Sequence, residues 1–272
     1  MKTKFLVILN LVIFFNVSAQ LINGKIFSSE TNNPIPYSRV GLEKNKFGVT
    51  SDEYGNFSID LSNQDKNQNI RIEVGGYEPM IITFNNFISQ NNKIFYLSEK
   101  IVDIEQVVLS PKKFIQKNWG INSKGKKIQF VYNPEKNKQS LSKELALPFE
   151  TKKRAKIEKI NINIAYFESD QPVFVRYNVY DQNWNSIISE DLSILMNAQK
   201  IKDSEFSFDV SDKFIWVKGK FYVSFQILNS FKGEIALSGT VFKPAFYREN
   251  LGNWEKTPTI CPSLNIDVKV EK

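Results

Sequence analysis

Apolar and polar residues alternate along much of the second half of the chain. Four stretches place every second side chain on one apolar face, and "EIALSGTVF" and "LNIDVKV" add two more candidates. The four faces consist of Ile160, Ile162, Ile164 and Tyr166; Val173, Val175, Tyr177 and Val179; Phe206, Phe208 and Val210; and Phe221, Val223, Phe225 and Ile227. A period of two predicts strands, and only "SEDLSILMNAQK" suggests a short helix or an irregular crossing. We therefore expect an all-β protein.

The first third of the chain has the same character in shorter segments. "LINGKIFSSETNNPIPYSRVGLEKN" predicts strand, turn and strand, and "KFGVTSDEYGNFSIDL" predicts a hairpin in which Phe57, Ile59 and Leu61 alternate after the turn. "NIRIEVGGYEPMIITF" predicts two strands about a Gly-Gly-Tyr corner, and "NKIFYLSEK" and "IEQVVLS" predict one each. Short strands with regularly spaced turns predict a small β-sandwich over residues 20–110.

Particular motifs in this segment resemble the carboxypeptidase regulatory-like family, whose fold is a transthyretin-like β-sandwich of seven strands. The matching stretches are "GKIFSSETNNPIPYSRV", "GVTSDEYGNFSIDL", "IEVGGYEP" and "IEQVVLS", within residues 21–110. Such domains are non-catalytic accessories, often in proteins exported by Gram-negative bacteria. The resemblance therefore implies a binding or structural role for this part of the chain.

Residues 111–150 are rich in Lys, Asn and Gln, and they are either a basic linker or the leading strands of a second domain, with "KKIQFVY" and "KELALPF" as candidates. Residues 151–272 carry enough predicted strands for a second sandwich, for which we expect the jelly-roll type. This part is similar to an uncharacterised β-sandwich that follows the regulatory-like domain in other exported bacterial proteins. That similarity supplies no functional residues.

The first residues have the order of a secretory signal. Lys2 and Lys4 precede an apolar run, and "NVSAQ" offers a cleavage site after Ala19, so we expect residues 1–19 to be a signal peptide. No later segment is apolar for long enough to span a bilayer. The mature protein is then expected to lack a transmembrane segment and to occupy the periplasm, the outer-membrane surface or the extracellular space.

The net charge is +7, from 36 basic and 29 acidic residues. Loss of Lys2 and Lys4 leaves 34 basic residues against 29 acidic ones, a net charge of +5. The excess lies at 110–130 and 151–156, where lysines keep a connector solvated or weakly attract anionic polysaccharide or lipid. No nucleic-acid-binding element accompanies these lysines, so nucleic acid is not an expected partner.

The chain contains no histidine and one cysteine, Cys261. These counts exclude Ser-His-Asp and Cys-His catalysis, histidine-based zinc sites and an intramolecular disulfide. Cys261 is expected to be a small packed residue. We predict no catalytic residue, no cofactor and no metal ligand.

The most site-like stretch is "SDEYGNFSI", residues 51–59. A calcium loop requires oxygen ligands at alternate positions and a closing Glu, which this stretch lacks. A turn requires only an Asp that caps local N–H groups and a Gly that tolerates positive φ, and Asp52 and Gly55 fit both roles. We interpret the stretch as a turn, with Tyr54 and Phe57 covering the edge of the sandwich.

Two further sets of residues suggest carbohydrate chemistry. Flat aromatic rings stack on sugars, and six acids in or beside predicted turns could include a glycosidase pair. The aromatic set is Trp119, Trp184, Trp216 and Trp254, with Tyr180, Tyr247 and Arg248 as polar partners; the acids are Glu168, Asp170, Asp181, Glu190, Asp191 and Glu234. We expect the aromatic rings to be core or edge residues and the acids to be solvated.

These observations predict an exported, non-catalytic binding or structural protein of the cell envelope. It would act as an interaction module for another envelope protein or a surface glycan. The alternative is a protein that binds or cleaves carbohydrate through the C-terminal sandwich. Coplanar exposed tryptophans, or two carboxylates that converge in a cleft, would favour the alternative.

Overall fold

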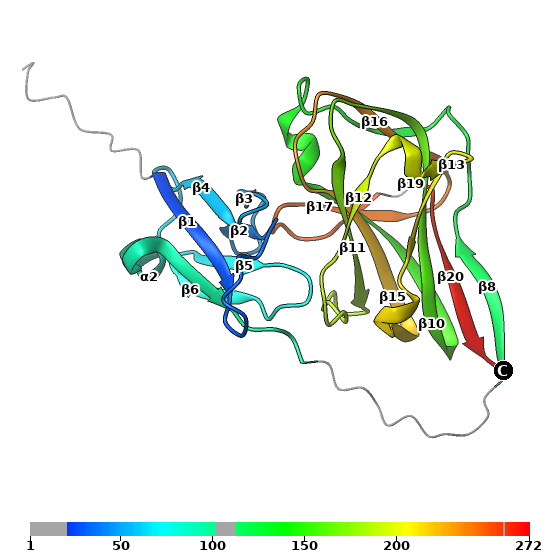
Figure 1. The fold of residues 1–272 in the computed structure, drawn as a ribbon, viewed down its shortest axis with the longest axis horizontal. Helices are drawn as coiled ribbons and strands as arrows, with labels where there is room; N and C mark the ends of the chain where they lie inside the picture. Colours follow the sequence, from blue (N-terminus) through cyan, green and yellow to red (C-terminus); the bar gives the residue numbers. More distant parts are fainter. Residues whose placement is uncertain (1–20, 102–112, 258) are drawn as a thin grey trace, which may run out of the picture.

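The computed structural model describes residues 21–101, 113–257 and 259–272, which form two β-sandwiches side by side (Figure 1). The expected signal segment 1–19 and the motif "IEQVVLS" (104–110) lie outside the described residues. The all-β prediction is confirmed. Among the described residues no helix has the length and apolar character needed to cross a membrane.

Within the described residues the first sandwich contains seven strands in two sheets, the number that the family resemblance implies. One sheet has the order β4-β1-β7 and the other β3-β2-β5-β6. The bounds are β1 Leu21–Ser28, β2 Arg39–Leu42, β3 Gly48–Thr50, β4 Asn56–Asp60, β5 Asn69–Glu73, β6 Met80–Thr83 and β7 Ile94–Leu97. The alternation in β4 buries Phe57 and Ile59, which pack with Ile26 and Ile72 in a core shared by both sheets.

The hairpin predicted around residues 48–60 is wrong. Strand β3 pairs with β2, whereas β4 pairs with β1 in the other sheet. The turn between them therefore connects the two layers. Tyr54 does not cover the sandwich edge as expected, because 59% of its surface is exposed, whereas Phe57 is buried.

One short helix was not predicted. Helix α2, Phe84–Ser89, begins after Thr83, whose hydroxyl caps the backbone N–H of Asn86. It buries Phe84 and Phe87 against the first core. Six residues are too few to produce a recognisable helical period. The short 3-10 helices are η1 Asn91–Lys93, η2 Lys138–Ser142, η3 Ala198–Lys200 and η4 Ser211–Lys213.

The second sandwich contains the remaining strands, connected through one hydrogen-bonded sheet. Their bounds are β8 Phe114–Gly120, β9 Gln129–Tyr132, β10 Lys143–Ser169, β11 Val173–Asp181, β12 Leu192–Met196, β13 Ile201–Lys202, β14 Glu205–Asp209, β15 Trp216–Ile227, β16 Gly233–Val241, β17 Ala245–Glu249, β18 Glu255–Thr257, β19 Ile260–Pro262 and β20 Leu264–Glu271. Residues 113–150 thus contribute β8, β9 and the start of β10. The segment "SEDLSILMNAQK" forms β12, a regular strand paired with β11, followed by η3. The prediction of a short helix or an irregular crossing is therefore wrong for the strand part.

Strand β10 joins the two layers of this sandwich. Its first half pairs with β15 and β17, and its second half pairs with β14, β20 and β16. The register shifts between Thr151 and Ala155, and such a bulge lets one strand pass from one layer to the other. A further shift, between Ile164 and Tyr166, leaves Tyr166 48% exposed. The prediction that Tyr166 shares the apolar face of Ile160, Ile162 and Ile164 is therefore wrong.

Candidate binding cleft between the two sandwiches

Four charged side chains connect the two sandwiches through a closed set of ion pairs. Arg39 on β2 and Glu73 on β5 belong to the first sandwich, and Glu144 on β10 and Arg248 on β17 belong to the second. Arg39 binds Glu73 at 3.1 Å and Glu144 at 2.6 Å. Arg248 binds the same two carboxylates at 2.9 and 2.8 Å. Each charge is thus compensated from both sides of the interface.

Neighbouring groups satisfy the remaining lone pairs of Glu144. The hydroxyls of Ser224 and Tyr180 donate to it at 2.5 and 2.8 Å. Burial acts to raise the pKa of Glu144, but Arg248 and Arg39 outweigh burial and hold it well below its usual value. The same competition, with Arg71 in addition, lowers the pKa of Glu73 to about 2. Both carboxylates are therefore ionised at neutral pH.

Further contacts fix how the sandwiches lie against each other. The Arg176 guanidinium on β11 donates to the backbone oxygen of Tyr37 at 2.8 Å, and the Tyr37 ring lies 5.3 Å from that of Phe174. Gly76 of the first sandwich, at φ +81°, lies very close to the backbone of Glu190 in the second. A Cβ at Gly76 would lie 2.5 Å from the Cα of Glu190. The interface thus combines buried ion pairs with close backbone contact, which gives the space beside it a defined shape.

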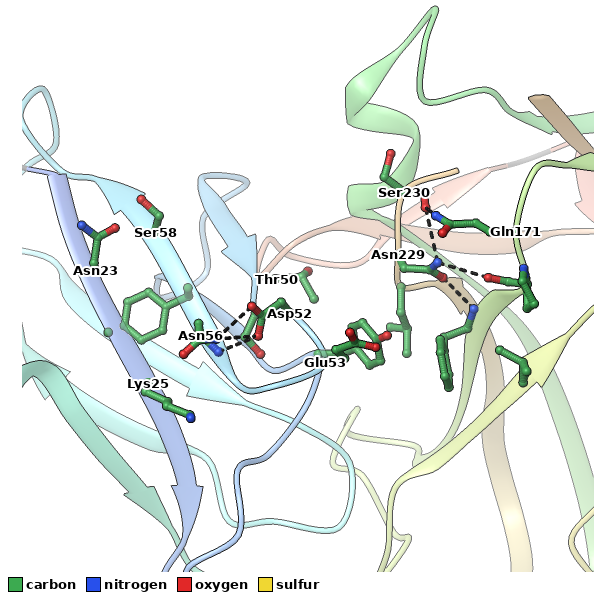
Figure 2. A pocket seen from close by; sticks show the side chains of 18 of the residues that line it. Asn23, Lys25, Thr50, Asp52, Glu53, Asn56, Ser58, Gln171, Asn229 and Ser230 are labelled. Atoms are coloured by element: carbon green, nitrogen blue, oxygen red, sulfur yellow. Dashed lines mark hydrogen bonds between the residues drawn. The ribbon is translucent and has the colours of Figure 1, made fainter. Parts of the chain in front are cut away.

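That space is an open cleft of about 1040 Å³ between the sandwiches (Figure 2). Ligand sites commonly lie at such domain boundaries. The first sandwich supplies Asn23, Gly24, Lys25, Tyr37, Thr50, Ser51, Asp52, Glu53, Asn56, Phe57, Ser58 and Asn92; the second supplies Gln171, Pro172, Phe174, Leu195, Leu228, Asn229 and Ser230. Most of the polar side chains among them are amides or hydroxyls.

The wall on the first sandwich is formed by β1 and β4. Asn23 and Ser58 are direct neighbours across these strands, and both side chains are exposed. Neither side chain makes a hydrogen bond within the described part of the chain, and the same holds for Asn92. These donors and acceptors are therefore available to a ligand.

The opposite wall is formed by the loops before β11 and after β15. Asn229 accepts the backbone N–H of Phe174 at 2.6 Å, and Gln171 donates to the backbone oxygen of Ser230 at 2.6 Å. These hydrogen bonds fix the position of each amide group and occupy only some of its donors and acceptors. Figure 2 shows Gln171, Asn229 and Ser230 facing the first sandwich across the cleft.

The predicted turn at Asp52 forms part of the cleft wall. Its carboxylate accepts the backbone N–H groups of Tyr54 at 2.9 Å and Asn56 at 2.8 Å, and Gly55 has φ +75°. Burial tends to raise the pKa of Asp52, but the hydrogen bonds from Asn56 and Tyr54 lower it overall. The turn geometry is confirmed. Its position beside the cleft could not be predicted, since the opposite wall lies more than 100 residues away in sequence.

The tryptophans do not form one flat surface. Trp184 is stacked between Tyr222, at 3.7 Å, and Trp254, at 4.2 Å, and both pairs of rings are inclined by 14°. Arg248 lies 4.9 Å from the Trp254 ring, so this stack adjoins the ion pairs. Elsewhere, Trp216 packs near Phe114 and Arg154, and Trp119 packs against the second core. Tyr180 joins the stack cluster, and Tyr247 donates to Glu255.

All six candidate acids are engaged locally, and Glu234 accepts the amide of Asn133 at 3.3 Å. Asp170 caps the backbone N–H of Lys232, Asp181 caps its own turn, Glu190 pairs with Lys213, and Asp191 pairs with Arg176. The structure does bring Glu168 and Glu234 together, as direct neighbours on β10 and β16. They line a shallow hollow of about 470 Å³ outside the cleft, where Glu168 accepts the hydroxyl of Tyr166.

Cys261 is fully buried, and burial raises the pKa of its thiol to about 11. A thiol in this state is protonated at neutral pH and is a poor nucleophile. Across the described ranges, His, Cys, Asp and Glu side chains form no group of three or more that could hold a metal ion.

Residues 22–109 match the family model of the CarboxypepD_reg-like domain. This is the family that the sequence motifs resemble. The match covers the whole first sandwich as described and no strand of the second. The recognition of this domain from its motifs is therefore confirmed. No curated protein matches the chain.

Solved structures give distant similarities. The chain resembles the cysteine protease and lectin-like domains of a surface layer associated protein of Clostridium difficile, with 9% identity and a TM-score of 0.37. The structural match covers 92% of this chain and 58% of the clostridial one. A carbohydrate-binding module of the β-sandwich superfamily, described as promiscuous in specificity, has 10% identity and a TM-score of 0.21, with 86% of this chain and 96% of that one covered.

Proposed function

We propose that the protein is an exported, non-catalytic binding protein of the cell envelope, and that its cleft holds a neutral surface glycan. The signal segment expected at residues 1–19 supports export, and the chemistry of the cleft walls supports the choice of ligand. A chain of neutral sugars carries closely spaced hydroxyl groups that both donate and accept hydrogen bonds. Side-chain amides do the same, so amides on two facing walls suit such a ligand.

The observation that carries the proposal is the mainly uncharged polar lining. Five side-chain amides line the cleft, against one lysine and two carboxylates. One carboxylate, Asp52, already accepts three N–H groups of its own turn, from the backbones of Tyr54 and Asn56 and the side chain of Asn56. Few charges remain to select an ionic ligand. The rigid interface beside the cleft favours a preformed site, which lowers the entropy lost on binding.

The cleft lining also supports binding without hydrolysis. Glycosidases use two carboxylates on either side of the bond that breaks. The two carboxylates among the lining residues, Asp52 and Glu53, are adjacent on one wall. The polar side chains of the opposite wall are those of Gln171, Asn229 and Ser230, and none of them is a carboxylate. Glu168 and Glu234 favour the second candidate, cleavage of carbohydrate at the C-terminal sandwich, because they are cross-strand neighbours that line the same hollow.

The test is calorimetric titration of the purified protein with a panel of neutral and acidic envelope glycans. We expect saturable binding to neutral members. Asn23→Ala and Asn92→Gly should each weaken it about two- to tenfold, since each removes hydrogen bonds worth about 0.5–1.5 kcal/mol. Asn85→Ala is the matched control, because Asn85 is an exposed amide on α2 outside the cleft.

Incubation with the same glycans tests the second candidate. We expect no release of shorter products. Turnover that disappears in Glu168→Gln or Glu234→Gln would establish hydrolysis at the hollow. Equal weakening of binding by Asn85→Ala and Asn23→Ala, or no binding at all, would overturn the assignment of the cleft.

A further inference from the structure

The connection after β16 presents an apolar tip to solvent. Val241 pairs with Ile260 on β19, and these side chains are 38% and 37% exposed. Phe242 follows, with 86% of its surface exposed. Its backbone is left-handed at φ +61°, and its N–H donates to the backbone oxygen of Thr259 at 2.6 Å. The hydrogen bond fixes the backbone at the position from which the ring extends into solvent.

This exposure and this conformation are both unfavourable in isolation. A bulky residue at positive φ is strained, and an aromatic ring in water gains nothing from burial. No ring stacking or cation contact of Phe242 occurs in the described residues. Strained, exposed apolar residues are characteristic of contact sites, and here three apolar side chains share one tip.

The segments next to the tip carry several lysines. The segment 122–129 lies beside β16, since the N–H of Gly239 donates to the backbone oxygen of Ile128 at 2.9 Å. This segment carries Lys124, Lys126 and Lys127, and Lys243 follows Phe242. All four lysines are exposed.

The segments 122–129, 239–244 and 259–261 contain no Asp or Glu. The four lysines have no ion-pair partner within the described ranges. Lys126 also lines the hollow that holds Glu168 and Glu234. The uncompensated positive charge of the tip therefore rests on Lys124, Lys127 and Lys243.

We propose that this tip docks on an anionic lipid surface. An apolar ring flanked by cations matches the boundary between acyl chains and anionic headgroups, where the ring is removed from water and each ammonium lies near a headgroup charge. Phe242 would enter that boundary with Val241 and Ile260 beside it. The contact is peripheral and reversible, because it involves few side chains. None of these residues lines the glycan cleft, so the two proposals are independent.

The experiment is co-sedimentation of the purified protein with phosphatidylcholine vesicles, with and without phosphatidylglycerol. We expect binding only when phosphatidylglycerol is present, and release on addition of salt. Lys243→Gln should weaken binding about fivefold, and Phe242→Asn about tenfold or more. Asn tolerates positive φ, so Phe242→Asn should retain the fold.

Phe214→Asn is the matched control. Phe214 is also left-handed, at φ +50°, and is 63% exposed, but Lys156 lies over its ring and it is far from the tip in sequence. The Phe214→Asn variant should leave vesicle binding unchanged. Lys66→Gln, in an exposed loop, should leave it unchanged as well. A Phe242→Trp variant should show a blue shift in fluorescence on phosphatidylglycerol vesicles.

Absence of vesicle binding at low salt would overturn the proposal. Binding that Phe242→Asn leaves unchanged would overturn it too, because charge alone would then account for the attraction. Equally strong binding to a soluble anionic polysaccharide, weakened to the same degree by Phe242→Asn, would assign the tip to that polymer and not to lipid.

Discussion

Gly55 and Trp184 occupy the same place in two turns with the same hydrogen bonds. In each turn an Asp carboxylate accepts the backbone N–H groups two and four residues later, from Asp52 in one case and Asp181 in the other. The residue before the closing Asn is left-handed in both, at φ +75° for Gly55 and +66° for Trp184. Two different sequences therefore adopt the same turn conformation.

The two occupants meet this backbone requirement differently. Glycine adopts positive φ without steric cost, whereas tryptophan is strained there by about 1 kcal/mol or more. Trp184 offsets the strain because the turn places its ring between Tyr222 and Trp254. The first turn is adapted to close backbone packing, and the second to positioning a ring.

Replacement of Gly55 tests the first half of this comparison. Gly55→Val should lower the free energy of unfolding by about 1–3 kcal/mol, because a β-branched residue is strained at positive φ. A Cβ there would also lie 2.7 Å from the backbone oxygen of Ile26. Urea unfolding gives the value.

Gly219→Val is the control for strain alone. Gly219 has the same φ of +75°, but a Cβ would meet nothing within 4 Å. We expect a smaller loss than at Gly55. Equal losses at the two positions would show that close packing around Gly55 contributes nothing.

Removal of metal should not affect the Asp52 turn. The carboxylate already accepts N–H groups from its own backbone, so no calcium is needed to hold the loop. A chelator should leave the melting temperature unchanged, and added calcium should not raise it, because a ligand stabilises only when it binds the folded state. A calcium-dependent rise that Asp52→Asn removes would contradict the turn interpretation.

The sequence predicted local structure well where side chains alternate. Val173, Val175, Tyr177 and Val179 are all buried on one face, as their period requires. Tyr166 departs from its predicted face because Ala165 is an extra residue in the strand, which shifts the phase. A bulge of this kind leaves no clear signal in an alternating sequence.

The cleft and its ion pairs could not be predicted in the same way. Arg39 and Glu144 are separated by 105 residues, and the motif that contains Arg39 indicates no partner for it in the second half of the chain. Their contact depends on how two separately folded sandwiches meet. The one available signal was the occurrence of charges on strands whose other residues are apolar, such as Arg39 in a wholly buried β2.

Loss of one partner in the buried set should be costly. Glu144→Gln removes a charge from beside two guanidiniums that remain buried, and breaking such a pair typically costs about 3–5 kcal/mol. Glu255→Gln is the control, since its pair with Lys46 also crosses the interface but leaves side chains that are 43% and 52% exposed. It should cost about 0–1 kcal/mol. Similar losses in urea unfolding would contradict a special role for the buried set.

Because the pKa values of Glu73 and Glu144 are lowered in the folded protein, we expect a loss of stability in acid. Glu73 titrates at about 2 when folded, below its ordinary value of 4.5, so the folded state releases its proton more readily than the unfolded state. Its contribution is complete above about pH 5 and falls as the pH decreases towards 2. For Glu73 alone the difference corresponds to about 3 kcal/mol.

Thermal unfolding between pH 7 and pH 2 measures this loss. In Glu73→Gln the decline in melting temperature over that range should be shallower than in the natural protein, because the group no longer titrates. A parallel decline in both proteins would place the acid sensitivity elsewhere.

Replacement of Trp184 decides whether its stack outweighs its strain. Trp184→Gly restores the residue type of the first turn and releases the backbone strain, but removes two stacked contacts, each worth about 0.5–1.5 kcal/mol beyond area burial. Since the ring also loses its partly buried surface, we expect a net loss of about 1–3 kcal/mol. The near-ultraviolet circular dichroism of the Trp184–Trp254 pair should disappear with it. Trp216→Leu, far from the stack, should retain that signal. A stability gain in Trp184→Gly would mean that the strain exceeds the stacking energy, and that the turn holds Trp184 for a purpose other than stability.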